Sequence, residues 1–173
     1  MTTTTETTVT TQVYRVYIKA TPQAIWDAIT KPEWTERYGF GGRVEYDLRP
    51  GGSYRVPTTE AMKKAGAEMG FATPDVMVDG EVIEADPPHR LVQTWRMLMD
   101  ADTEAEGFTR LTYEIEERQG GVTKLTLVHD LEGAPKVAVL CRGEREAEGA
   151  GGGWSWVLSD LKTLLETGAS FRG

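Results

Sequence analysis

The sequence predicts an α+β domain in which a curved antiparallel sheet of six or seven strands wraps around a long C-terminal helix, with two short helices after the first strand. Three observations lead to this fold. Short segments of alternating apolar and polar residues recur along the middle of the chain. Helix signals follow the first of them, and residues 154–165 carry the longest apolar stripe at helical spacing. Because the apolar face of the sheet needs a cover, we expect it to wrap around this last helix.

The chain opens with strand and helix signals in close succession. Residues 13–18 are mainly β-branched and aromatic, as is typical of a strand. Thr21 can cap a helix that has Pro22 at its first position, and residues 32–38 predict a second, shorter helix. Two short helices are therefore expected between the first strand and the rest of the sheet.

The remaining strands are predicted from alternation and turn residues. A hairpin is predicted from a strand at residues 43–49, a turn at 50–52 and a second strand at 53–56. Further strands are expected at residues 82–84, 91–99, 110–116 and 123–129. The side chains predicted to face the helix by this alternation are Val44, Tyr46 and Leu48, Leu111, Tyr113 and Ile115, and Leu125, Leu127 and His129.

Composition excludes several classes of function. The chain has 173 residues, 39% of them hydrophobic, which is enough for one domain; we assign it to residues 13–173, after a disordered threonine-rich tail at 1–12. A net charge of −8 argues against nucleic acid, and one cysteine with two histidines gives too few ligands for a Cys/His zinc cluster, so we expect no metal site. No cofactor is expected either. The tail lacks the features of a signal peptide, and no apolar stretch is long enough to enter a membrane, so we expect a cytoplasmic protein.

Several segments carry recognisable motifs in a fixed order, and they are residues 21–30, 47–52, 80–91, 94–95 and 153–161. Taken in this order, they resemble the signatures of the SRPBCC superfamily, and most closely the branch named after the activator of the heat-shock-90 chaperone's ATPase. The resemblance implies the helix-grip fold shared with lipid-transfer and pollen-allergen domains, and a hydrophobic pocket between the sheet and the last helix. The resemblance does not indicate a reaction that the protein would catalyse. A chaperone partner is not expected, because the chain carries none of the extra domain through which the larger eukaryotic members grip the chaperone.

One segment departs from the family pattern. Residues 57–78 are inserted where a turn between strands would suffice, and they can form a short helix. Its apolar side chains Met62, Met69 and Phe71 suggest a lid on the pocket mouth, a dimer contact or plain packing. The sequence therefore leaves open whether the chain forms a homodimer.

The candidate pocket residues are the aromatic and large apolar side chains expected near the open end of the sheet, with one histidine. They are Trp34, Phe40, Tyr46, Trp95, Met97, Tyr113, His129, Trp154 and Leu158. If Tyr46 and Tyr113 face inward, each hydroxyl needs a partner, which can be water, a side chain or a ligand.

Only one pair of neighbours suggests catalysis. His129 precedes Asp130 at a strand end and can move a proton near neutral pH, but a histidine satisfied by a backbone carbonyl is the simpler interpretation. Cys141 has no histidine near it in sequence and is expected to be inert. No catalytic residue is assigned. We therefore expect a module that binds a small hydrophobic or aromatic molecule; the alternatives are a cyclase/aromatase- or hydrolase-like enzyme and a chaperone-associated or stress-related interaction protein.

Overall fold

The structure, a computed structural model that describes residues 10–173, is built around one seven-stranded antiparallel sheet, as predicted. The order of the strands is β1-β7-β6-β5-β4-β3-β2. Their bounds are β1 (Thr11–Ile18), β2 (Glu45–Tyr46), β3 (Ser53–Pro57), β4 (Val76–Asp86), β5 (Arg90–Met97), β6 (Thr109–Glu117) and β7 (Thr123–Asp130).

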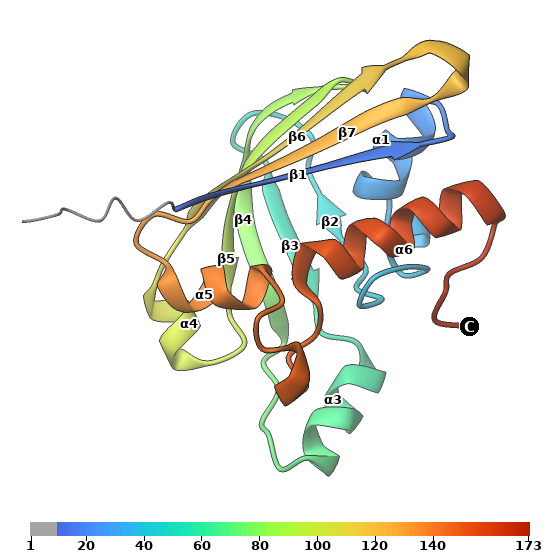
Figure 1. Ribbon diagram of the computed structural model, residues 1–173. Coiled ribbons are helices and arrows are strands. Elements are labelled where there is room, and N and C mark those ends of the chain that lie inside the picture. Colours follow the sequence, from blue (N-terminus) through green and yellow to red (C-terminus); the bar gives the residue numbers. More distant parts are fainter. Residues whose placement is uncertain (1–9) are drawn as a thin grey trace, which may run out of the picture.

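Six α-helices accompany the sheet in the described part of the chain. They are α1 (Pro22–Thr30), α2 (Pro32–Thr35), α3 (Glu60–Glu68), α4 (Ala101–Ala105), α5 (Pro135–Cys141) and α6 (Gly153–Thr167). Figure 1 shows α6 lying across one face of the curved sheet, α4 and α5 side by side near one end of it, and α3 projecting away from it. This is the helix-grip arrangement that the sequence predicts. None of the helices is long and apolar enough to cross a membrane.

The C-terminal helix α6 packs mainly against β1, α1 and α5. Its side chain Lys162 donates from Nζ to the carbonyl oxygen of Tyr17, 2.6 Å away, so the helix also ties itself to the edge strand β1. The helix ends at Gly168, which adopts the left-handed conformation with φ of 84° and donates its N–H to the Leu164 carbonyl.

The register of the central strands brings the predicted inward faces together. Leu111 lies opposite His129 and Tyr113 lies opposite Leu127 across β6 and β7, and all four side chains are buried. Since residues opposite one another in an antiparallel pair point to the same face, these side chains form one continuous part of the core.

Some predicted boundaries differ from the structure. The strand β1 starts at Thr11, inside the segment expected to be a tail, while residues 1–9 of that tail lie outside the described residues. Leu48 is exposed, contrary to the predicted inward face, because β2 ends at Tyr46 and the alternation does not continue. Both ends of the expected insertion at 57–78 belong to strands, with Pro57 opposite Val76.

Candidate functional site

The concave face of the sheet is covered unevenly. Under α6, the β6 and β7 residues Leu111, Leu125 and Leu127 are fully buried. Toward β2–β5 and the start of α6, Met97 and Trp154 are only partly buried, although they pack against the same core. We call this half-covered region the concave wall; it comprises Tyr46, Tyr54, Trp95, Met97, Tyr113 and Trp154.

Two of the buried tyrosines donate to partners in the protein. The Tyr38 hydroxyl donates to the Ala28 carbonyl at 2.8 Å, and the Tyr46 hydroxyl donates to Oε1 of the buried Gln93 at 2.5 Å. The rings of Tyr46 and Tyr54 lie 4.6 Å apart, tilted by 30°. The partner that the inward-facing Tyr46 hydroxyl needs is thus the side chain of Gln93. Nothing in the sequence pattern had indicated Gln93 as this partner.

The Tyr54 hydroxyl lies within hydrogen-bonding reach of the Trp95 and Gln93 side chains. The Tyr113 hydroxyl makes none of the side-chain hydrogen bonds found in residues 10–173, although its side chain is only 9% exposed. No side-chain nitrogen or oxygen in this part of the chain is both sealed from solvent and without a partner, so the Tyr113 oxygen must border space that a water molecule can reach. Burial raises the pKa of both groups, so each keeps its proton at neutral pH.

His129 is fully buried and bonded to side chains at both ring nitrogens. The Thr109 hydroxyl donates to the Trp95 carbonyl at 2.9 Å, so it must accept from His129 Nε2 at 2.7 Å. Trp154 Nε1 donates to His129 Nδ1 at 3.1 Å. These bonds assign the neutral tautomer with the proton on Nε2.

The environment of His129 removes its ability to exchange protons near neutral pH. Burial lowers its pKa from 6.5 to about 3. Its neighbour Asp130 accepts instead from the Glu132 N–H, and no backbone carbonyl of residues 10–173 is bonded to the ring, contrary to the simpler sequence interpretation. His129 thus joins the sheet to α6 through side chains.

Cys141 lies beside this histidine, a proximity that the sequence did not indicate. Its Sγ is 3.9 Å from His129 Nδ1, and the thiol is buried at the end of α5. Burial raises the pKa of the thiol to about 12. The pair therefore lacks both the thiolate and the basic imidazole that nucleophilic catalysis requires.

The other predicted pocket residues are spread over the molecule. Leu158 is buried in the core, and Trp34 is partly buried with Arg37 stacked on its ring at 4.8 Å. Phe40 is 53% exposed and lies away from the concave wall, in a hollow near the start of α6. The structure thus brings together Tyr46, Trp95, Met97, Tyr113, His129, Trp154 and the core residue Leu158 on the concave side.

The predicted lid residues lie on and after α3. Met62 is partly buried, whereas Met69 is 71% and Phe71 is 65% exposed. The side chain of Thr59 caps this helix by accepting from the Met62 N–H. Whether these side chains cover a pocket or a second copy of the chain stays a prediction.

Two of the hollows on the surface of residues 10–173 can be described by their lining, and neither of these two includes the tyrosines. The first, of about 280 Å³, is lined by Ile83, Thr94, Phe108, Thr109, Arg110, Asp130 and Glu132. The second, of about 400 Å³, is lined by Gly39, Phe40, Glu146, Gly149, Gly151, Gly152, Trp156 and Arg172. The apolar cavity predicted beneath α6 therefore stays a prediction. Residues 10–173 also contain no group of three or more metal-ligating side chains.

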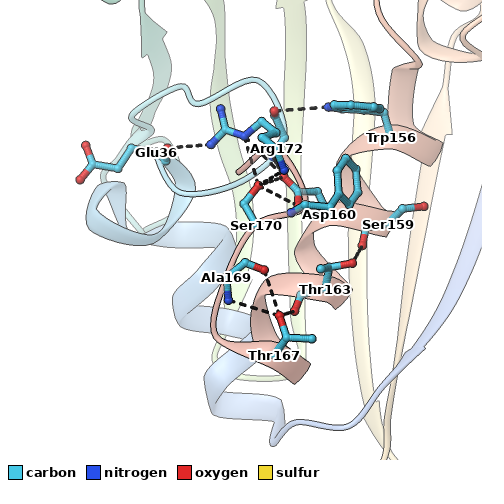
Figure 2. A network of polar contacts seen from close by, with 11 residues as sticks. Glu36, Trp156, Ser159, Asp160, Thr163, Thr167, Ala169, Ser170 and Arg172 are labelled. Carbon is cyan, nitrogen blue, oxygen red and sulfur yellow. Dashed lines mark hydrogen bonds and ion pairs between the residues drawn. The ribbon is translucent and has the colours of Figure 1, made fainter.

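A buried carboxylate on α6 was missed by the sequence reasoning. Asp160 is fully buried, accepts from the N–H groups of Gly39 and Phe171 at 2.9 and 2.8 Å, and accepts from the Ser170 hydroxyl. Arg172 Nε lies 3.6 Å from the same carboxylate. Figure 2 shows how this network folds the segment after α6 back along the helix.

Comparison with solved structures supports the same fold. An HSP90 activator from Plasmodium falciparum is 19% identical, with a TM-score of 0.60 over 91% of this chain and 96% of that chain. CalU16 from Micromonospora echinospora is 19% identical, with a TM-score of 0.62 over 94% of this chain and 69% of that chain. The Aha1 dimer from Colwellia psychrerythraea is 16% identical, with a TM-score of 0.60 over 92% of this chain and 98% of that chain. At these identities the likeness establishes the fold alone.

No curated protein matches the sequence. A family model does: the one described as Activator of Hsp90 ATPase homolog 1-like protein matches residues 19–166, from the end of β1 to the last turn of α6. The match therefore includes the whole concave wall and the helix that crosses it. On this ground the chain belongs to the family of Activator of Hsp90 ATPase homolog 1-like proteins, within the SRPBCC superfamily.

Proposed function

We propose that this protein binds a small, mostly apolar molecule against the concave wall, in the space that α6 leaves partly uncovered. The observation that carries the proposal is the Tyr113 hydroxyl, whose side chain is nine-tenths buried and which makes none of the side-chain hydrogen bonds found in residues 10–173, in a wall where Met97 and Trp154 stay only partly buried. A fold seldom leaves buried polar groups unpaired, so such groups point to water or to a ligand.

The side chains of the concave wall around this hydroxyl suit an apolar or aromatic molecule. Trp95 and Trp154 lie 6.2 Å apart at ring centroids, and the partly buried Met97 adds an adaptable apolar side chain. A few polar groups set in an apolar lining are typical of small-molecule sites.

The enzyme alternative has less support. Both nitrogens of His129 are occupied by Thr109 and Trp154, and its pKa lies far below neutral. Tyr54 and Tyr113 keep their protons, so neither supplies a base at neutral pH. Binding, which requires only the hydrogen-bonding capacity of these groups, accounts for the arrangement better than turnover does.

A fluorescence titration tests the proposal. The uncharged dye N-phenyl-1-naphthylamine is titrated into the full chain, and its emission is expected to rise with saturation at one equivalent. The Met97→Trp variant fills part of the concave wall, so its dissociation constant for the dye should rise at least about tenfold. The matched control is Met99→Trp, because Met99 is exposed two residues beyond β5 and its replacement leaves the wall unchanged.

Two outcomes would count against this function. Absence of saturable binding by the native protein would show that the wall holds no such molecule. Equal weakening in Met97→Trp and Met99→Trp would place the dye elsewhere. Native mass spectrometry after incubation with a metabolite extract then identifies the natural ligand class in the protein that binds the dye.

A further inference from the structure

The hollow near the start of α6 is lined by aromatic, charged and glycine residues. Its volume is about 400 Å³, and its larger side chains are those of Phe40, Glu146, Trp156 and Arg172. The rest of the lining is glycine, at residues 39, 149, 151 and 152. Because glycine has no side chain to fill the space, the rings and charged groups of the hollow stay open to a molecule from outside.

Three of these side chains converge on two consecutive glycines. A Cβ atom placed on Gly151 would lie 2.7 Å from Cε1 of Phe40, closer than such atoms pack in proteins. A Cβ atom placed on Gly152 would lie 2.9 Å from Cβ of Trp156 and 3.4 Å from Oε1 of Glu146. Phe40, Glu146 and Trp156 therefore surround the same bare stretch of backbone, although they come from three different segments of the chain.

The two aromatic side chains of the hollow offer uncovered ring surface. Trp156 donates from Nε1 to the Gly39 carbonyl at 3.3 Å and packs edge-to-face with Phe171, with ring centroids 4.7 Å apart. These contacts hold the indole in place before any ligand arrives, which reduces the entropy that binding costs. Phe40 is 53% exposed, so much of its ring is free. The faces of aromatic rings carry negative electrostatic potential and attract cations.

The positive charge of the hollow is already neutralised within the protein. Arg172 Nε lies 3.6 Å from the buried carboxylate of Asp160, and the Arg172 Nη2 donates to the Glu36 carbonyl at 3.3 Å. Figure 2 shows the guanidinium group held between these two partners. Arg172 and Asp160 thus contribute no net charge to the hollow.

The negative charge of Glu146 is not neutralised in the same way. In the same turn of the chain, Glu144 pairs with Arg142 at 2.7 Å and Glu148 pairs with Arg145 at 2.6 Å. The Glu146 carboxylate, although it lines the hollow, makes none of the ion pairs or side-chain hydrogen bonds found in residues 10–173. The hollow therefore presents one unpaired carboxylate beside two aromatic side chains.

We propose that this hollow binds a small organic cation, such as a quaternary ammonium group, against Phe40 and Trp156 and beside Glu146. A quaternary ammonium has no N–H groups that need acceptors, so contact with ring faces and one carboxylate can replace its hydration. An anion would meet the charge of Glu146 without gaining a free cation. The site is separate from the concave wall, and the inference does not depend on the function proposed for that wall.

Three small molecules of similar size separate charge from shape. Choline carries a trimethylammonium group, 3,3-dimethylbutan-1-ol has the same shape without the charge, and glycine betaine adds a carboxylate to the cation. Each is titrated into the full chain while proton–nitrogen correlation NMR follows the indole N–H of Trp156, whose signal is assigned by its loss in Trp156→Phe. Choline is expected to bind saturably and about five- to thirtyfold more tightly than the alcohol, the equivalent of cation–π contacts and one exposed ion pair.

Substitutions in the hollow identify the groups that bind the cation. Phe40→Leu keeps an apolar side chain and removes the ring, so it should weaken choline binding about two- to fivefold and leave the alcohol unaffected. The matched control is Phe108→Leu, because Phe108 is also 53% exposed but lines the other hollow. Glu146→Gln should weaken choline binding by a similar factor. Glu117→Gln changes the net charge equally at an exposed position outside the hollow and should leave choline binding unchanged.

Several results would overturn this inference. Equal affinity for choline and the alcohol would show that the hollow does not select charge, and absence of a saturable shift of the Trp156 signal would show that it binds no cation. Tighter binding of glycine betaine than of choline would show that Arg172 receives a carboxylate, so that the ligand is a zwitterion. A choline affinity unchanged in both Phe40→Leu and Glu146→Gln would place the cation elsewhere. None of these results bears on the concave wall, which is tested separately with N-phenyl-1-naphthylamine.

Discussion

Replacing Asp160 by alanine is expected to destabilise the protein by about 2–4 kcal/mol. The substitution removes the acceptor from the N–H groups of Gly39 and Phe171, at 2.9 and 2.8 Å, and from the Ser170 hydroxyl. Ser170 and Arg172 can turn toward water, but the two backbone donors are held in place by the chain. A buried donor left without an acceptor costs about 1–3 kcal/mol. Two such donors together would cost about 2–6 kcal/mol. Because the Phe171 N–H is only partly buried, we expect a loss in the lower part of this range.

The assay is urea unfolding of the full chain at pH 7, followed by tryptophan fluorescence. For a domain of this size, about 2–4 kcal/mol corresponds to a fall in Tm of roughly 5–15 °C. Asp160→Asn keeps one acceptor oxygen and should lose less. Ser159→Ala, at the exposed neighbouring position on α6, should stay within about 0.5 kcal/mol of the native protein.

A second measurement ties the loss to the segment after α6. Because Asp160 binds Ser170 and Phe171, its replacement should release this segment and increase the rate at which carboxypeptidase removes the last residues. A variant Asp160→Ala that unfolds within about 0.5 kcal/mol of the native protein, and is trimmed no faster, would refute the reasoning.

Two further predictions concern His129 and Cys141, which are buried side by side next to α6. Burial lowers the pKa of His129 to about 3, so between pH 6.5 and 3 the unfolded chain binds a proton that the folded chain does not, and stability falls as the pH falls. From pH 6.5 to 5 the native protein should lose about 1.6 kcal/mol more than His129→Gln in urea unfolding at each pH, and equal losses would contradict this. Since burial raises the pKa of Cys141 to about 12, Ellman's reagent should label the thiol at least ~100-fold more slowly in native buffer than in denaturing urea; comparable rates would show that the thiol is accessible.

The faces of the long strands could be predicted from the sequence because alternation has a strict period of two. This alternation assigns Leu111 and Tyr113 on β6 to one face, and it assigns Leu125 and Leu127 on β7 in the same way. All four side chains are buried, as predicted. The alternation around Leu48 had the same appearance, but only residues 45 and 46 pair as β2, and an isolated pair of residues does not fix the direction of the next side chain.

Short helices and buried polar partners were harder to predict. The helix α5 has only seven residues, with Pro135 at its start and the buried Val137 and Ala138 behind it, which is too few positions for a clear period. Asp160 did leave a signal. It lies three residues after Val157 and four before Leu164, on the apolar stripe of α6, where a carboxylate requires buried donors. Which donors these are depends on Gly39 and Phe171, from other parts of the chain.

The buried polar groups of this protein differ in whether the fold supplies their partners. His129 and Asp160 are buried and fully bonded, and they hold the first half of α6 and the segment that follows the helix. The Tyr113 hydroxyl is buried to a similar degree but makes none of the side-chain hydrogen bonds found in residues 10–173. Substitution of Asp160 should therefore reduce stability. Tyr113→Phe should leave the free energy of unfolding within about 0.5 kcal/mol of the native protein, since no intramolecular side-chain bond is lost.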